Sequence, residues 1–158
     1  MNSPKEILLL YATNSGSTFV SGQIIKDVLS PDLAVNMQNT LEFNPVDIKN
    51  YDTIILGSPS WESRGEEGMP TETMLKLFDV WSKEDFSNKN FVIYGCGDDA
   101  YINFCGAVDQ MEKFVNLVKG KLIFSSLRLN AFFFELDKNV ELTKKWAIGL
   151  KEKLKTLV

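Results

Sequence analysis

The sequence predicts an α/β protein with a doubly wound parallel sheet covered by helices on both faces. Four apolar runs do not alternate with polar residues, which is typical of strands buried on both sides. The stretches between these runs show the apolar spacing of amphipathic helices. The chain has 158 residues, of which 44% are hydrophobic, so we expect one domain spanning residues 1–158.

The predicted strands follow one another at wide intervals, as a parallel sheet with helical crossovers requires. The sequence places them at residues 7–11, 53–56, 91–94 and 122–124, with a weaker strand at 33–37. Four helices are expected over residues 17–29, 71–81, 104–118 and 139–157. Pro31 ends the first helix, and Gly120 is expected to cap the carboxyl end of the third.

The absence of histidine restricts the possible chemistry most strongly. It excludes Ser-His-Asp and Cys-His nucleophile systems and histidine metal ligation. Two cysteines, Cys96 and Cys105, are too few for a disulfide framework and suit a reducing compartment such as the cytoplasm. A net charge of −4 disfavours nucleic acid as a partner, and no apolar run approaches the ~18 residues of a membrane span. We therefore expect a protein of the cytoplasm whose chemistry depends on a cofactor.

Three loops that follow predicted strands carry residues able to bind a ligand, because ligands of open parallel sheets lie at the carboxyl ends of the strands. The first loop, residues 13–18, contains only small or hydrogen-bonding residues and leads directly into a helix. Its N–H groups and the positive end of the helix dipole suit a phosphate group. The same serines and threonines also suit an ordinary helix cap. No lysine occurs between Tyr11 and Gln23, so the loop is not of the Walker type.

The second loop begins at Gly57 and places Trp61 in a polar, glycine-containing segment. A ring there either covers a flat ligand or folds back onto the domain. The third loop, residues 94–109, contains a run from Gly95 to Ala100 that formally matches a dinucleotide fingerprint. We reject that match because the loop follows the fourth strand and two adjacent aspartates would repel a pyrophosphate. The aspartates alone also suit a solvated turn.

Together the three loops resemble those of the flavodoxins, and the resemblance covers nearly the whole chain. The motif Thr13-x-Ser15-Gly16-x-Thr18 resembles the phosphate loop of that family, and Gly57-x-Pro59-Ser60-Trp61 resembles the loop that lays an aromatic ring against the flavin. The second flavin loop is matched by Gly95-Cys96-Gly97-Asp98 with Tyr101 and Phe104-Cys105-Gly106. The resemblance implies a three-layer sandwich around a five-stranded sheet of order 2-1-3-4-5, of the short-chain type. The run of three phenylalanines at 132–134 is expected to pack beneath the connection to the last helix.

The resemblance also implies noncovalent FMN as the cofactor, with its phosphate in the first loop and its ring between Trp61 and Tyr101. Gly97 and Asp98 would line the edge of the ring. Glu62 stands where many short-chain members have glycine, and the peptide there is the one expected to reorient when the flavin is reduced. The full set of cofactor-binding residues that the resemblance implies is Thr13, Asn14, Ser15, Gly16, Ser17, Thr18, Ser58, Pro59, Ser60, Trp61, Glu62, Cys96, Gly97, Asp98, Tyr101, Phe104 and Cys105.

The function implied is that of a low-potential electron carrier, a monomer that shuttles single electrons between redox partner proteins and has no substrate turnover of its own. A flavin enzyme of the same fold, such as a quinone reductase, would need a nicotinamide or quinone site that no motif supplies. A response regulator would need acidic residues where Thr13 and Ser58 stand.

Charge is distributed unevenly along the chain. Residues 60–70 contain three Glu and one Arg, residues 96–109 contain three Asp, and the two segments together carry −5. Residues 138–158 contain six Lys and two Glu, which gives +4. We expect a dipolar molecule whose acidic end faces reductases and acceptor enzymes with basic docking surfaces.

Overall fold

A single parallel sheet forms the centre of the protein. The structure is a computed structural model that describes residues 6–157. The strands of the sheet lie in the order β2-β1-β3-β6-β7, and β8 also pairs with β6. All of these pairings are parallel, which confirms the predicted order with a fifth strand divided into two segments. The strands are β1 (Ile7–Tyr11), β2 (Val35–Asn39), β3 (Thr53–Pro59), β6 (Asn90–Gly97), β7 (Lys121–Leu122) and β8 (Leu127–Asn130).

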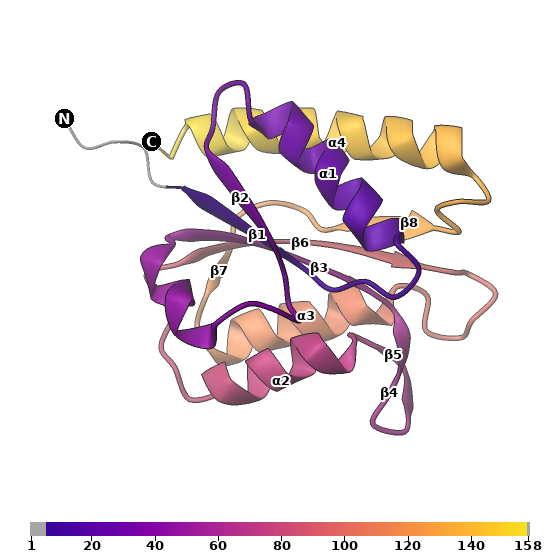
Figure 1. Ribbon diagram of the computed structural model, residues 1–158, viewed down its shortest axis with the longest axis horizontal. Helices are drawn as coiled ribbons and strands as arrows, with labels where there is room; N and C mark the ends of the chain where they lie inside the picture. Colours follow the sequence, from indigo (N-terminus) through magenta and orange to yellow (C-terminus); the bar gives the residue numbers. More distant parts are fainter. Residues whose placement is uncertain (1–5, 158) are drawn as a thin grey trace.

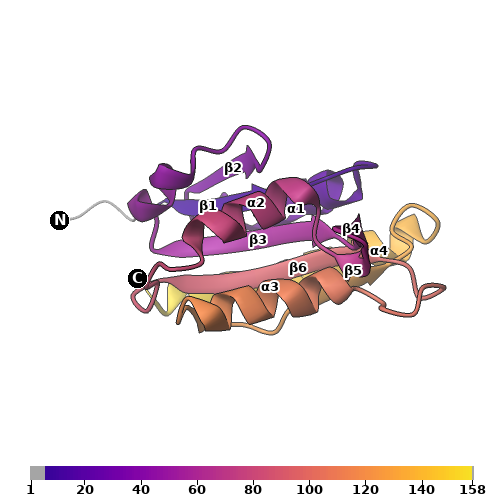
Figure 2. The same cartoon turned by 90° about the horizontal axis from the view of Figure 1, so that it is seen from below.

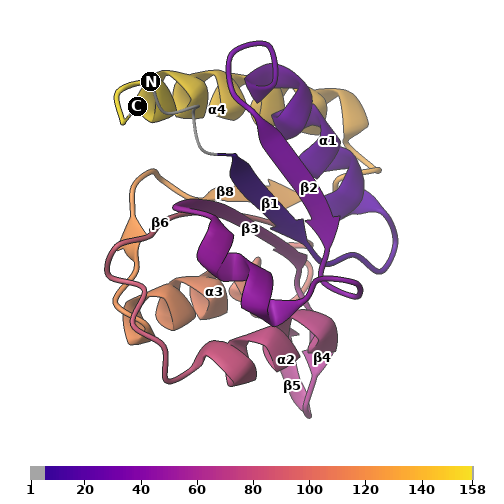
Figure 3. The ribbon, with the colours of Figure 1, turned by 60° about the vertical axis from the view of Figure 1, so that its left-hand side comes forward.

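Two helices cover each face of the sheet and confirm the predicted α/β sandwich (Figures 1 and 3). Helices α1 (Ser17–Leu29) and α4 (Leu136–Lys155) lie on one face, and their apolar residues join a core that includes Leu9, Ile55 and Val92. Helices α2 (Glu72–Trp81) and α3 (Gly106–Leu117) lie on the other face, as Figure 2 shows. None of the helices within residues 6–157 is long and apolar enough to cross a membrane.

The continuous apolar strands are buried because both faces are covered in this way. Leu8, Leu9 and Leu10 are all fully buried although they alternate between the two cores. This is the burial that non-alternating apolar runs predict for a parallel sheet.

Two short elements were not predicted. A 3-10 helix, η1 (Pro45–Asn50), follows β2. An antiparallel hairpin of β4 (Trp61–Ser63) and β5 (Glu66–Met69) extends from the end of β3. Its turn places Arg64 and Gly65 at φ 54° and 79°, as a tight hairpin turn requires. The polar, glycine-containing segment that suggested an open loop is therefore a hairpin.

The last strand lies further along the chain than predicted. Of the expected 122–124 run only Leu122 belongs to β7, which pairs with β6, and strand pairing resumes in β8. In between, the ring of Phe124 lies 5.8 Å from that of Trp146 in α4, with the planes at 62°. The apolar run is therefore explained by packing against α4 as well as by strand pairing.

Other element limits differ by a few residues. Strand β2 is displaced by two residues from the predicted 33–37, α3 begins at Gly106 instead of 104, and α4 begins at Leu136 instead of 139. Cys105 has a left-handed backbone (φ 49°) that precludes an earlier start for α3. Helix α1 has the predicted limits.

The fully buried side chain of Tyr94 connects the sheet to the start of α1. Its hydroxyl donates a hydrogen bond of 2.9 Å to the carbonyl oxygen of Thr18. A Cβ atom on Gly57 or on Gly22 would overlap this side chain, so both glycines are needed where the strand and the helix approach it. Burial raises the pKa of Tyr94 well above its usual value, so the hydroxyl stays protonated and continues to donate. The first turn of α1 is thereby held at a fixed height over β3 and β6.

The carboxyl end of α3 differs from the predicted glycine cap. The N–H of Gly120 donates to the carbonyl of Val115 and that of Lys119 to Asn116, which is a Schellman motif. The left-handed residue of this motif is Lys119, at φ 66°, and not Gly120. A Cβ atom on Gly120 would lie 2.6 Å from the ring of Phe91. Gly120 is thus needed for close packing, and the cap glycine is absent.

We therefore expect Lys119→Gly to stabilise the protein by about 0.5–1 kcal/mol. The left-handed backbone costs a non-glycine residue roughly 1–2 kcal/mol, and the greater freedom of glycine in the unfolded chain offsets part of the gain. Urea unfolding measures the change. Lys119→Ala is the control that removes the side chain and keeps Cβ, and it should give no gain. Gly120→Ala should destabilise by roughly 1–3 kcal/mol through overpacking, and a stabilised Gly120→Ala variant would contradict this interpretation of the cap.

Candidate functional site

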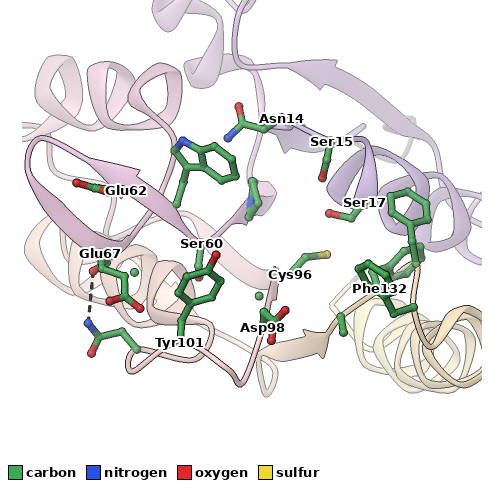
Figure 4. Close-up of a pocket in the computed structure, with 18 of the residues that line it drawn as sticks. Asn14, Ser15, Ser17, Ser60, Glu62, Glu67, Cys96, Asp98, Tyr101 and Phe132 are labelled. Atoms are coloured by element: carbon green, nitrogen blue, oxygen red, sulfur yellow. Dashed lines mark hydrogen bonds between the residues drawn. The ribbon is translucent and has the colours of Figure 1, made fainter.

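A cavity of about 730 Å³ opens at the carboxyl ends of β3 and β6, where the loops that follow the strands converge (Figure 4). Its size is within the range of sites for cofactors and other small molecules. Figure 4 shows Asn14, Ser15 and Ser17 along one side and Tyr101 with Asp98 along the opposite side. Phe132 lies at the end near Ser17, and Glu62 with Glu67 lies at the other end.

The first loop turns from β1 into the amino end of α1, which presents backbone N–H groups toward the cavity end of the helix. The hydroxyl of Thr13 accepts a hydrogen bond of 3.0 Å from the N–H of Gly16, whose φ of 97° favours glycine. The first N–H groups of a helix have no partner within it. The hydroxyl of Thr18, fully buried in the first turn, also has no hydrogen-bond partner within residues 6–157. The loop therefore presents donors and no compensating acidic side chain.

The second loop places Trp61 at the mouth of the cavity, on the hairpin. The indole is 54% exposed, which is unusual for the largest apolar side chain. The hairpin is held to α2 by Arg64, whose guanidinium lies 2.9 Å from a carboxylate oxygen of Glu72 and 2.8 Å from one of Asp79. Hydrogen bonding to Arg64 lowers the pKa of both carboxyl groups. This ion-pair cluster connects α2 to the hairpin that carries Trp61.

The third loop is joined to both neighbouring loops. Asn103 donates a hydrogen bond to the carbonyl of Glu67 on the hairpin. A Cβ atom on Gly106 would collide with the backbone of Gly68, and a Cβ atom on Gly68 would collide with Asn103. The hairpin and the third loop therefore pack too closely here for a side chain on either glycine. At the other end, the Asn130 side chain accepts a hydrogen bond of 3.0 Å from the N–H of Asp99. The third loop is therefore hydrogen-bonded to the hairpin on one side and to the end of β8 on the other.

Most of the cofactor-binding residues predicted from the sequence line this cavity. They are Asn14, Ser15, Ser17, Pro59, Ser60, Trp61, Glu62, Cys96, Gly97, Asp98 and Tyr101.

Six other predicted residues lie close by without lining it. Thr13, Gly16 and Thr18 shape the first loop, and Ser58 is buried with its hydroxyl accepting a hydrogen bond from the N–H of Thr71. Phe104 packs against the core, and Cys105 is fully buried beneath the third loop, where burial raises the pKa of its thiol to about 12. The structure thus gives Phe104 and Cys105 a packing role rather than contact with the cavity.

The expectation that 132–134 is simple packing is wrong for two of the three phenylalanines. Phe132 is buried, but Phe133 is 48% exposed and Phe134 93% exposed, and all three line the cavity. They follow β8, which the sequence analysis placed too early, so the loop at its carboxyl end was overlooked. Other lining residues that the sequence analysis did not include are Gly65, Glu67, Gly68, Asn103 and Ala131.

Among residues 6–157, no lysine or arginine lines the cavity, and three carboxylates, Glu62, Glu67 and Asp98, lie on it. No ion pair involves these three within the described part of the chain, residues 6–157. Residues 6–157 also contain no cluster of cysteine and carboxylate side chains suited to a metal ion. An anion in this cavity must therefore be held by N–H groups, hydroxyls and the dipole of α1.

Comparison with known proteins agrees with this geometry. The flavodoxin family model matches residues 9–143. The chain belongs to the flavodoxin family. Flavodoxins are electron carriers that bind FMN.

A probable flavodoxin 2 of Bacillus subtilis (strain 168) is 33% identical over 126 residues, which are 78% of this chain and 81% of the relative. The crystal structure of oxidised flavodoxin 2 from Bacillus cereus superposes with a TM-score of 0.82 at 31% identity, covering 94% of this chain and 99% of that one. A Fusobacterium nucleatum flavodoxin bound to flavin mononucleotide has the same fold, with a TM-score of 0.80 at 19% identity, and covers 94% of this chain and 98% of its own.

The residues of the cavity fit the flavodoxin cofactor. One end offers the hydroxyls of Ser15 and Ser17 and the amino terminus of α1, which suit a phosphate dianion. The buried hydroxyl of Thr18, which has no hydrogen-bond partner within residues 6–157, lies in the same helix turn. The mouth offers two exposed rings, Trp61 and Tyr101, which suit a flat aromatic group.

The Arg64 cluster gives an expected pH dependence for the hairpin. Arg64 lowers the pKa values of Glu72 and Asp79, so the ion pairs stabilise the hairpin at every pH above the usual pKa of a carboxyl group. This stabilisation is lost as the pH falls through the lowered pKa values. We expect Arg64→Gln to speed amide hydrogen exchange of residues 61–69 at pH 7, by a small factor because the pairs are exposed. The difference from the wild type should vanish at acid pH.

Lys151→Gln is the control, since Lys151 in α4 pairs with Asp32 after α1, on the face of the sheet opposite α2 and the hairpin's ion pairs. It should leave exchange of the hairpin unchanged. Equal exchange of residues 61–69 in the wild type and Arg64→Gln at pH 7 would show that the cluster does not hold the hairpin.

Proposed function

We propose that this protein holds noncovalent FMN in the cavity and passes single electrons between redox partner proteins, without substrate turnover of its own. The observation that carries the proposal is the combination, in one cavity, of an anion-binding helix end and two exposed aromatic rings. A helix end alone or an exposed ring alone has simpler explanations, namely a cap and surface packing. Both together at the correct end of a parallel sheet match the two ends of FMN.

FMN when bound supplies the redox chemistry, since its ring accepts and releases electrons singly or in pairs. The protein binds it at both ends and excludes water from the ring faces through Trp61 and Tyr101. Several charge-assisted hydrogen bonds of roughly 1.5–3 kcal/mol each, together with burial of the ring, can reach the ~12 kcal/mol of nanomolar binding. The carboxylate of Asp98 beside the ring would oppose the addition of negative charge, which favours a low potential.

The rim of the cavity supports a transient protein partner with a basic surface. Glu62, Glu66 and Glu67 on the hairpin and Asp98 and Asp99 on the third loop carry negative charge around the mouth without ion-pair partners within residues 6–157. Two apolar side chains, Ile102 and Phe134, are 92% and 93% exposed on the third loop and the loop after β8. Charge would steer the partner, and the apolar tips would make brief contact near the ring.

The proposal includes a monomer located in the cytoplasm. Both cysteines are free and buried, which suits a reducing compartment. Like charges on the rim disfavour contact between the rims of two copies of the chain.

Purification tests the cofactor. The protein should be yellow, and acid should release FMN at one molecule per chain. The apoprotein should rebind one FMN per chain, and the bound FMN should quench the fluorescence of Trp61. Trp61→Ala should weaken FMN binding by roughly tenfold, because stacking and apolar contact are lost.

Two results would contradict the proposal. Failure of the apoprotein to bind FMN, or a preference for FAD, would exclude the cofactor. Rapid oxidation of NADPH with a quinone in the absence of a reductase would indicate a flavin enzyme instead of a carrier.

The charge distribution gives a second expectation, on partner encounter. Stopped-flow electron transfer from a reductase should slow as ionic strength rises, because salt screens steering. Neutralising Glu66, Glu67 and Asp99 to amides should flatten this dependence.

The control neutralises Asp27, Glu84 and Glu152, which are exposed and do not line the cavity. This triple variant has the same net charge as the rim variant and should keep the salt dependence of the wild type. An equal loss of salt dependence in both variants would assign the effect to net charge and not to the rim.

A further inference from the structure

The loop after β8 places an aromatic ring against the anion-binding loop, and no motif of the sequence assigned it a function. We propose that Phe133 covers the phosphate end of the cofactor site, shields it from water, and determines how strongly the protein prefers FMN to riboflavin. The inference rests on the proposed FMN function and extends it to a specificity-determining residue on a fourth cofactor loop.

The position of the ring is the first support. The Cζ atom of Phe133 lies 3.9 Å from the place that a Cβ atom would take on Gly16, so the ring is in van der Waals reach of the loop that precedes α1. Phe133 also lines the cavity and is 48% exposed, so the residue is not enclosed by the protein and remains accessible to a ligand. Phe133 therefore lies beside the loop of N–H donors.

The ring is held in place by a braced turn. Phe133 packs edge to face on the buried ring of Phe132, with centroids 5.3 Å apart. The turn begins at Ala131, whose φ is 48° and whose N–H donates to the carbonyl of Gly97 at 2.8 Å.

From the other side, the buried side chain of Asn139 in α4 donates to the carbonyls of Asn130 and Phe132 at 2.8 and 3.3 Å. A left-handed non-glycine residue persists only where its surroundings fix it. The turn is thus a built feature of the cavity, connected to β6 on one side and to α4 on the other.

Phe133 would place an apolar ring beside a phosphate that has no cationic side chain near it among the described residues. No lysine or arginine of the described residues lines the cavity, so the phosphate depends on hydrogen bonds from N–H groups and hydroxyls. Such bonds strengthen as water is excluded, because the local dielectric falls. A ring over the loop excludes water without competing for the donors. Riboflavin lacks the phosphate, so its binding gains little from this shielding.

The test compares FMN and riboflavin binding to the apoproteins of the wild type and Phe133→Ala by flavin fluorescence. We expect the dissociation constant for FMN to rise about tenfold and that for riboflavin by less than about threefold. The FMN constant should also become more sensitive to salt, because the phosphate site is then open to screening. Phe133→Leu, which keeps an apolar side chain, should retain most of the preference for FMN over riboflavin.

Phe124→Ala is the matched control, because Phe124 is a partly buried phenylalanine that packs on α4 and does not line the cavity. It can lower stability but should leave the ratio of the two constants unchanged. An equal weakening of both flavins in Phe133→Ala, or no change in either, would overturn the inference. Failure of the wild type itself to bind FMN would instead overturn the proposed function, so the two failures are distinct.

Discussion

The structure depends on one buried tyrosine between the sheet and its first helix. Tyr94 reaches from β6 across β3 to the carbonyl of Thr18, and two glycines, Gly57 and Gly22, provide the space for its ring. This contact sets the height of the first turn of α1 above the sheet. The loop of N–H donors therefore has a fixed position relative to the end of β6, which carries Cys96 and Gly97 at the floor of the cavity.

The remaining walls are fixed by connections between loops. The hairpin is tied to α2 through Arg64 and to the third loop through Asn103, and the loop after β8 is tied to Gly97 through Ala131. Each wall thus carries its ligand-facing residues on backbone that is held at two points. A preformed site of this kind loses little conformational entropy on binding, so most of the interaction free energy contributes to affinity. Because no basic side chain within residues 6–157 lines the cavity, affinity for an anion comes from oriented dipoles.

Local patterns in the sequence predicted the sheet, the four helices and three of the four cavity loops, because burial on both faces and small polar residues at strand ends leave clear signals. The cap of α3 was misassigned because Gly120, which is needed for packing against Phe91, stands next to Lys119, which has the left-handed backbone. The hydrophobic periodicity of the helix does not distinguish these two roles. The fourth loop was missed because the apolar run at 122–124 packs on α4 as well as pairing in the sheet. Phe133 and Phe134 were therefore interpreted as core residues. Residue type alone does not reveal whether an apolar ring in a turn points into the core or into a cavity.

The central claim is that one cavity holds both ends of FMN, with the ring at the hairpin and the phosphate at α1. A crystal structure of the FMN complex tests it most directly. The account predicts the flavin ring between Trp61 and Tyr101, the phosphate within hydrogen-bond distance of the N–H groups and hydroxyls of residues 14–18, and the ring of Phe133 beside it. A phosphate bound at any other loop, or a flavin lying outside the two aromatic rings, would contradict the account.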